Sequence, residues 1–171
     1  MKNIILFGFM GTGKTTVGKI ISKKLNLPLL DMDSIITQEE GKSVKLIFNE
    51  NGESYFRNLE NKLVRRLSKH TDNIISTGGG VILNEENITL FRENSFLVCL
   101  TASPKNILER LRNDTTRPLL RENNIEKENE INHLLKERKK MYNKISFQIN
   151  TDFVNPQLIA QEIIRKYNKN N

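Results

Sequence analysis

The first residues that could do chemistry lie close to the N-terminus. The segment Gly8 to Thr15 reads Gly-Phe-Met-Gly-Thr-Gly-Lys-Thr and matches the pattern G-x-x-x-x-G-K-[ST]. In such a loop, glycines let backbone N–H groups turn around phosphate oxygens, the lysine reaches the terminal phosphates, and the hydroxyl binds Mg²⁺. The alternative is a glycine turn that binds nothing, and the apolar run before it and the helical periodicity after it disfavour that alternative. The pattern therefore predicts a nucleoside triphosphate site.

Two acidic residues, Asp31 and Asp33, end a short predicted strand over 28–33. A period of two puts both carboxylates on the same side of a sheet, and ligands of α/β sheets bind beyond the carboxyl ends of the strands. One acid could serve Mg²⁺ through water, and the other could orient the proton of an attacking hydroxyl. Alternatively, either Asp caps the next helix, near Ser34.

Two more groups stand out in the middle of the chain. Arg57 precedes Glu60 by three residues, a spacing that also suits a simple surface pair on a helix. Three consecutive glycines, Gly78 to Gly80, end another predicted strand. They would let backbone amides approach a ligand closely, although a plain strand-to-helix turn is the alternative.

Four arginines surround or lie within a polar segment over 113–130: Arg110, Arg117, Arg121 and Arg138. Guanidinium groups suit phosphate and carboxylate better than ammonium groups do. Any one of these arginines alone could be structural. A shared anion site for several of them is the interpretation that we favour.

The elements that must position these residues alternate along the chain. Strands are predicted at 4–9, 28–33, 74–77, 96–100 and 146–150. Helices are predicted at 14–25, 34–67 with a break near 51–52, 104–111 (with Ser103 as its cap), 131–142 and 156–167. This alternation predicts one α/β domain over 1–171, with a central parallel sheet of about five strands and helices on both faces. The aperiodic segment 113–130 is interpreted as a mobile lid.

Composition narrows the possible classes of protein. The chain has 171 residues, a net charge of +7, 37% hydrophobic residues and one cysteine, Cys99, so a disulfide framework is excluded. With only His70 and His133 besides, no Cys/His zinc cluster is expected. The apolar run 4–10 passes straight into the glycine loop, and no apolar run is long enough for a membrane span. We expect a cytoplasmic protein that does not bind membranes.

Several other functions fit the residues less well. A GTPase would carry D-x-x-G and N-K-x-D patterns, and neither occurs. A nucleic-acid-binding protein, or a regulator that binds ATP without transferring phosphate, is the alternative from another class. Only 6% of the residues are aromatic and the basic residues form no continuous stripe, so we expect no nucleic-acid partner. The short chain favours a small-molecule kinase.

Taken together, the motifs resemble the shikimate kinase family in order and spacing, over nearly the whole chain. They are the segments 8–15, 31–33, 52–60, 78–80 and 116–120, and Arg138 with Tyr142. The resemblance implies the fold of the nucleoside monophosphate kinases. It also implies ATP- and Mg²⁺-dependent phosphorylation of the 3-hydroxyl of shikimate, which gives shikimate 3-phosphate on the route to chorismate and the aromatic amino acids. We expect a monomer.

The resemblance further implies roles for individual residues. Asp33 would hold the reacting hydroxyl, and Lys14 and Arg117 would complete the catalytic set. Mg²⁺ would be served by Thr15 and Asp31. Shikimate would be bound by Asp33, Arg57, Gly79, Gly80 and Arg138, within a substrate-binding helical region over 34–67. ATP would be bound by Gly11, Thr12, Gly13, Lys14, Thr15, Thr16, Arg110, Arg117 and Pro156.

One segment departs from the family pattern. Many members place an arginine just before the late Asn-Pro that borders the adenine, whereas this chain has Asp152-Phe153-Val154-Asn155-Pro156. Phe153 or Pro156 could pack against the base instead. The nearest competing function is a gluconate kinase, which shares the loop and the size, and an adenylate kinase fits less well.

Overall fold

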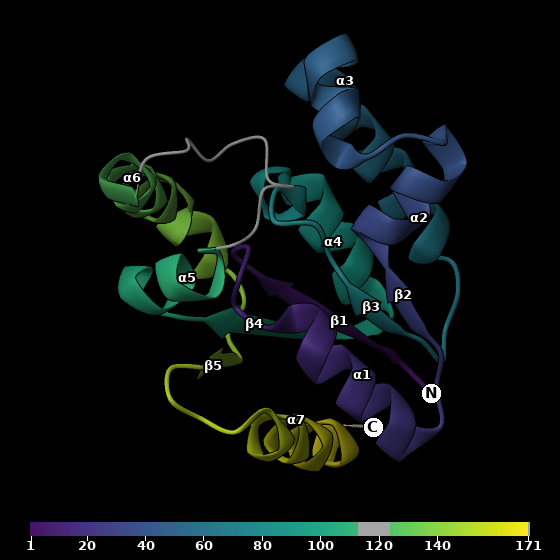
Figure 1. Ribbon diagram of the computed structural model, residues 1–171. Coiled ribbons are helices and arrows are strands. Elements are labelled where there is room, and N and C mark those ends of the chain that lie inside the picture. The colour runs from purple at the N-terminus through teal and green to yellow at the C-terminus, as the bar shows by residue number, and fades with distance from the viewer. Residues whose placement is uncertain (113–123, 171) are drawn as a thin grey trace.

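The computed structural model describes residues 1–112 and 124–170, which form one α/β domain (Figure 1). Its five strands are all parallel and lie in the order β2-β3-β1-β4-β5. They are β1 (Asn3–Gly8), β2 (Leu29–Asp31), β3 (Ile74–Ser76), β4 (Ser95–Thr101) and β5 (Gln148–Asn150). The prediction of a five-stranded parallel sheet is confirmed.

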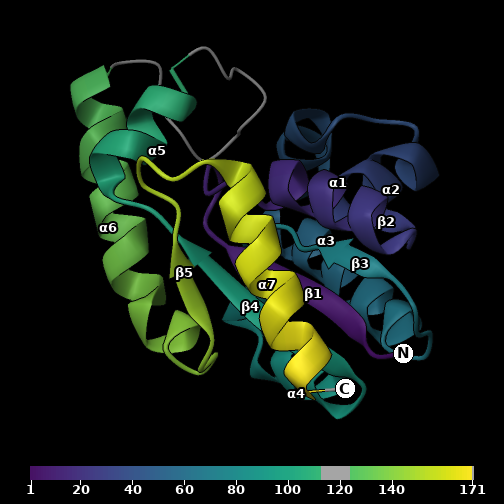
Figure 2. The same cartoon turned by 90° about the horizontal axis from the view of Figure 1, so that it is seen from below.

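Helices cover both faces of the sheet, as predicted. They are α1 (Lys14–Leu25), α2 (Met32–Glu40), α3 (Val44–Leu67), α4 (Glu85–Glu93), α5 (Pro104–Arg110), α6 (Asn124–Tyr142) and α7 (Pro156–Asn170), with a short 3-10 helix η1 (Val81–Leu83). Figure 2 shows α7 in front of the sheet when it is viewed from below. Within the described residues, no helix is both long and apolar enough to cross a bilayer.

Successive side chains of the central strand β1 point to opposite faces of the sheet and contribute to two hydrophobic cores. All six residues of β1 are buried. Ile4 and Leu6 belong to one core, together with residues of α1 and α7, whereas Ile5 and Phe7 belong to the core beneath α3 to α6. A strand that is buried on both faces has a continuous apolar sequence, which is what Ile4 to Phe7 shows.

The strand order places the functional loops together. Along the sheet, β1 is flanked by β3 and β4, so the chain leaves β1 toward one edge and later crosses to the other side of β1. Such a reversal opens a crevice at the carboxyl ends of the strands. The glycine loop follows β1, Asp31 ends β2, and the three glycines follow β3 by one residue.

The region 34–67 is helical, as predicted, but it consists of two helices. Gly41, with φ 65°, ends α2, and Ser43 caps α3 by accepting a hydrogen bond from the Leu46 N–H. The predicted break near 51–52 is a kink at Gly52, whose φ of 80° and ψ of 171° are not helical. A side chain at this position would strain the backbone, so glycine is suited to the kink.

Three predictions about elements were wrong. β2 ends at Asp31, and Asp33 lies in the first turn of α2, so the two acids do not share a strand face. Neither η1 nor α4 was predicted. α6 begins at Asn124 rather than at 131, so the predicted start of this helix was wrong. Of the expected lid, 124–130 is helical and 113–123 lies outside the described residues.

Candidate active site

The glycine loop lies against a large cavity. Gly11 and Gly13 of the loop, together with Lys14, Thr15 and Thr16 at the N-terminus of α1, line a cavity of about 760 Å³. The Lys14 ammonium is buried in the loop, where it donates hydrogen bonds to the carbonyls of Gly8 (2.8 Å) and Phe9 (2.9 Å). The loop thus holds its cation in place before any phosphate arrives.

Thr12, another residue expected to bind ATP, forms hydrogen bonds within the glycine loop. Its side chain is buried and donates to the Phe9 carbonyl at 2.8 Å, and its backbone N–H points to the same carbonyl at 3.3 Å. Thr12 does not line the cavity. In this structure it closes the turn of the loop.

The residues expected to serve Mg²⁺ meet at one edge of this cavity. The Thr15 hydroxyl donates to Asp31 Oδ2 at 2.7 Å and lies 3.2 Å from the Ser76 hydroxyl. Asp31 also caps α2, because its Oδ1 accepts from the backbone N–H of Ser34 at 3.1 Å. The capping alternative is therefore correct for Asp31, and the same carboxylate still reaches Thr15.

This donor set fits Mg²⁺. All its atoms are oxygens, and Mg²⁺ prefers oxygen ligands, keeps several waters and binds through one or two carboxylates plus substrate phosphates. No cluster of three or more His, Cys, Asp or Glu side chains suited to a metal occurs in 1–112 and 124–170, so this edge is not a complete protein cage. Sequence reasoning missed Ser76, although a hydroxyl near the carboxyl end of a predicted parallel strand was a usable signal.

Asp33 reaches the site from a helix instead of a strand. Its side chain approaches Gly78, where a Cβ would lie 2.8 Å from Asp33 Oδ1. Asp33 lines both the large cavity and a smaller one of about 40 Å³ beside it. The expectation that Asp31 and Asp33 face one site is met, but by a strand end and a helix turn.

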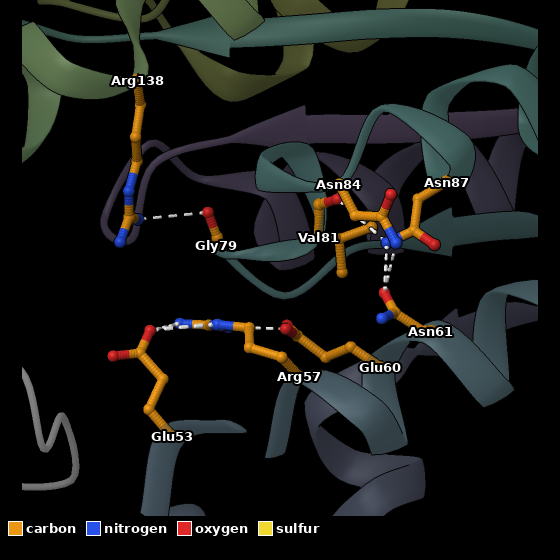
Figure 3. A network of polar contacts seen from close by, with 9 residues as sticks. All are labelled: Glu53, Arg57, Glu60, Asn61, Gly79, Val81, Asn84, Asn87 and Arg138. Atoms are coloured by element: carbon orange, nitrogen blue, oxygen red, sulfur yellow. Dashed lines mark hydrogen bonds and ion pairs between the residues drawn. The ribbon is translucent and has the colours of Figure 1, made fainter. Parts of the chain in front are cut away.

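Arg57 is held by two carboxylates on its own helix (Figure 3). Its Nη1 donates to Glu60 Oε2 at 2.5 Å, and its Nη2 donates to Glu53 Oε1 at 2.8 Å. Its guanidinium carbon lies 5.8 Å and 5.7 Å from the ring centroids of Phe48 and Phe56. The pair with Glu60 is not the surface pair that the spacing also allowed, because Glu60 is 1% exposed.

Arg138 lines the same small cavity from α6, and in Figure 3 its side chain lies across from that of Arg57. Its side chain is buried, its Nη1 donates to the Gly79 carbonyl at 3.2 Å, and its guanidinium lies 5.3 Å from the centroid of the Phe9 ring. The structure thus brings together the substrate residues that were predicted from far apart in the sequence. The small cavity is lined by Asp33, Arg57, Gly79, Gly80 and Arg138, together with Met10, Val44, Phe48, Phe56 and Glu60.

Glu60 is a residue of this site whose role sequence reasoning did not identify. Its carboxyl is almost wholly buried, and Oε1 has no hydrogen-bond partner among the described residues. Burial raises the pKa of the Glu60 carboxyl to about 7, although Arg57 beside it favours the ionised form. An exposed i,i+3 pair and a buried one have the same spacing, so the spacing alone could not show this.

The residues expected to border the adenine do not line the large cavity, in contrast to most residues of the glycine loop. Arg110 donates to the Gly11 carbonyl at 3.0 Å and to the Thr151 carbonyl at 2.7 Å, so it ties the glycine loop to the segment after β5. Arg110, Phe153 and Pro156 do not line the large cavity. Phe153 is 92% exposed and Pro156 begins α7. Arg117 and Arg121 lie outside the described residues.

Comparison with known proteins adds to this geometry. A family model described as shikimate kinase matches residues 10–168. The chain is 48% identical over 164 residues to the shikimate kinase of Caldicellulosiruptor bescii, which covers 96% of this chain and 94% of the relative. The structure matches the shikimate kinase of Acinetobacter baumannii, solved in complex with shikimate. The TM-score is 0.93 and the identity 32%, over 99% of this chain and 94% of that one.

The fold is also shared with kinases of other specificity. A gluconokinase from Sinorhizobium meliloti matches with a TM-score of 0.61 but is only 14% identical, over 98% of this chain and 92% of that one. At that identity the similarity shows a common fold and nothing about the substrate.

Proposed function

The chain belongs to the shikimate kinase family, and from this premise we propose how its pocket binds and aligns two substrates. It is an ATP-dependent kinase that transfers the γ-phosphoryl group of ATP to the 3-hydroxyl of shikimate, in the route to chorismate and the aromatic amino acids. The observation that carries the assignment of the site is the meeting of Arg57 and Arg138 beside the phosphate loop, with Asp33 between the two cavities.

ATP would place its phosphates in the large cavity. The backbone of Gly11 and Gly13, with Thr16, would surround them, and Lys14 would exchange the carbonyls of Gly8 and Phe9 for phosphate oxygens. Thr15 and Asp31 would hold Mg²⁺, which neutralises developing charge on the phosphates when it is bound. The hydrogen bond between Thr15 and Asp31 keeps these two oxygens at the same edge of the cavity.

Shikimate would occupy the junction of the two cavities, because about 40 Å³ is too little for its ring. Its carboxylate would lie between Arg57 and Arg138, and planar guanidinium groups suit such a carboxylate. Gly79 and Gly80 bring their backbone to the same wall. Asp33 would accept the hydrogen bond of the reacting hydroxyl and aim it at the phosphates.

Three further parts of the proposal concern the expected lid, the adenine and the helices next to the substrate. Arg117 would neutralise the transferring phosphoryl group from the expected lid, where exclusion of water suppresses hydrolysis. Arg110 and Pro156 would border the adenine, with Phe153 in place of the arginine found in many relatives. The helices α2 and α3 would form the substrate-binding region.

We also propose a cytoplasmic monomer. Its nucleotide substrate is a cytoplasmic compound, and its only cysteine, Cys99, is a free buried thiol that does not require an oxidising compartment. A single chain also supplies both arginines of the carboxylate clamp. Light scattering behind a size-exclusion column should give a mass near 19.8 kDa.

A coupled assay of ADP release tests the proposed activity. Release should require shikimate and Mg²⁺, and gluconate or nucleoside monophosphates should give no more than the background rate of ATP hydrolysis. The Asp33→Asn variant should lose phosphoryl transfer and still bind ATP, because the substituted side chain contacts the reacting hydroxyl of shikimate and not the nucleotide. Equal turnover with gluconate would contradict the substrate assignment.

A further inference from the structure

Glu60 holds a carboxyl oxygen that the other residues of the site leave without a partner. Oε2 accepts from Arg57 Nη1, whereas Oε1 is buried and has no hydrogen-bond partner in the part of the chain that the structure describes. Leaving such an oxygen as part of a carboxylate anion is costly, because a buried anion needs several hydrogen bonds to replace its water. A proton on Oε1 removes the charge and with it the larger part of that cost.

Glu60 lines the small cavity of the expected substrate site. A Cβ at Gly78 would collide with Glu60 Oε1 and would also lie 2.8 Å from Asp33 Oδ1, so these two carboxyl groups lie against the same side of Gly78. Charged groups reach Glu60 from three helices: Arg57 on α3, Asp33 on α2 and Arg138 on α6. The first and last of these are the two expected partners of the substrate carboxylate.

We propose that Glu60 is a positioning residue that must carry a proton on Oε1 for the anionic substrate to bind, because only then is the charge of Arg57 available to the substrate carboxylate. The inference rests on the proposed function, since it concerns how the same pocket admits shikimate. The proton comes from solvent when shikimate binds and returns to solvent when the product leaves.

The charges around Arg57 support this. With Glu60 neutral, Arg57 has one carboxylate partner, the partly exposed Glu53. With Glu60 ionised, Arg57 is already paired with two carboxylates before the substrate adds its own. Like charges in a buried pocket disfavour one another, so the ionised form of Glu60 and the bound carboxylate oppose each other.

The direction of the pH effect follows from the thermodynamic linkage between proton binding at Glu60 and shikimate binding. Burial raises the pKa of Glu60 in the free enzyme to about 7, and a bound carboxylate near Arg57 raises it further. Below pH 7 the proton is already present and affinity does not change with pH. Above pH 7 the proton must be taken up on binding, so affinity for shikimate falls as pH rises until the pH passes the pKa of the complex.

Calorimetric titration with shikimate, in buffers of different ionisation enthalpy, measures both quantities on the wild-type chain. At pH 8 we expect uptake of about half a proton or more for each shikimate bound. Between pH 6.5 and 8.5 the dissociation constant should rise about five- to twentyfold. The substrate's own carboxyl ionises near pH 4 and does not contribute in this range.

Two variants separate Glu60 from other groups. Glu60→Gln keeps the shape and the acceptor for Arg57 but cannot ionise, so it should bind shikimate with little pH dependence and without the proton uptake. Glu53, the other carboxylate partner of Arg57, has a side chain that is 49% exposed. The Glu53→Gln variant should therefore retain both the proton uptake and the pH dependence. In steady-state kinetics the effect should appear in the KM for shikimate and not in the KM for ATP.

The outcomes are distinct. Wild-type protein that binds shikimate without proton uptake and with the same affinity from pH 6.5 to 8.5 overturns the inference, and so does uptake that persists in Glu60→Gln. A folded Glu60→Gln variant that binds ATP but has lost shikimate at every pH also overturns it, because the ionised carboxylate would then be required. If that variant does not fold, the proton count of the wild type decides. Failure of the wild type to bind shikimate at all contradicts the proposed function instead.

Discussion

At the scale of single residues, the helix cap formed by Asp31 is compatible with the role toward Mg²⁺ that we propose for the same carboxylate. One oxygen caps α2 and the other accepts from Thr15, so the cap fixes the direction in which the second oxygen points. Capping hydrogen bonds hold a side chain in one rotamer, and a metal ligand benefits from the same restriction. Choosing between the two interpretations of Asp31 was therefore unnecessary.

The two glycines of the substrate wall differ in what a methyl group would meet. A Cβ at Gly80 would overlap the Arg57 guanidinium, whereas at Gly79 it would lie 3.6 Å from Met10 N and 3.9 Å from Arg138 Nη1, which are ordinary contacts. Gly80→Ala should therefore displace Arg57 and raise the KM for shikimate at least tenfold, a loss of about 1.4 kcal/mol or more in binding.

Gly79→Ala is the matched control for this change, and it should alter the same KM by less than about threefold. Steady-state kinetics at saturating ATP provide the comparison, with the KM for ATP as an internal reference. Equal effects of the two substitutions would show that Arg57 can move away from Gly80 without loss.

The sequence motifs predicted which residues lie together in the site, but they did not predict how deeply a residue such as Glu60 is buried. The positions of Lys14, Thr15, Arg57 and Arg138 in one site followed from the motifs and the resemblance. The buried state of Glu60 did not, because an i,i+3 spacing says nothing about what covers the helix.

At the scale of elements, α3 is fixed to the segment after the three glycines by a cluster of amides (Figure 3). The Asn61 side-chain oxygen on α3 accepts from Asn87 Nδ2 at 2.9 Å and from Asn84 Nδ2 at 3.2 Å. Asn87 also donates to the Val81 carbonyl of η1 at 3.1 Å. These contacts join the helix that carries Arg57 to the segment that carries Gly80.

Removing the shared acceptor should destabilise the protein. In Asn61→Ala, the buried amide of Asn87 and the amide of Asn84 both lose that acceptor, and we expect a decrease of about 1–3 kcal/mol in the free energy of unfolding. Urea denaturation followed by circular dichroism measures it. Asn58→Ala, at an exposed position on the same helix, is the control and should change stability by less than about 0.5 kcal/mol. Similar losses in the two variants would contradict a role for the cluster.

The element predictions failed for two different reasons, because α4 has clear helix signals that were not used and 124–130 has almost none. The residues that form α4 carry a cap at Asn84, acids at Glu85 and Glu86, and buried apolar positions at Ile88 and Phe91, and these signals were sufficient for a helix. For 124–130, only Ile125 is apolar, so periodicity gave no indication of a helix. Its observed helical state reflects continuity with the buried positions of α6, among them Ile131 and Arg138.

At the scale of the whole molecule, the fold followed from the alternation of apolar strands and amphipathic helices, but the order of the strands did not. The position of β3 between β2 and β1 depends on contacts far apart in sequence, such as the register of Ile74 with Ile4 and with Leu29. That order brings the ends of three strands to one crevice, so the active site is a consequence of topology.

The buried carboxyl of Glu60 should make the stability of the whole molecule depend on pH. Its pKa is raised from 4.5 in the unfolded chain to about 7 in the folded protein, so the folded state binds more protons between these values and stability falls as pH rises through that window. A difference of about 2.5 pH units corresponds to roughly 3 kcal/mol, fully lost above pH 7. Urea denaturation of wild-type protein and Glu60→Gln from pH 5 to 8 gives the difference in their free energies of unfolding. The stability of the variant relative to the wild type should rise with pH, and parallel curves would show that Glu60 is ionised in the folded protein as well as in the unfolded chain over this range.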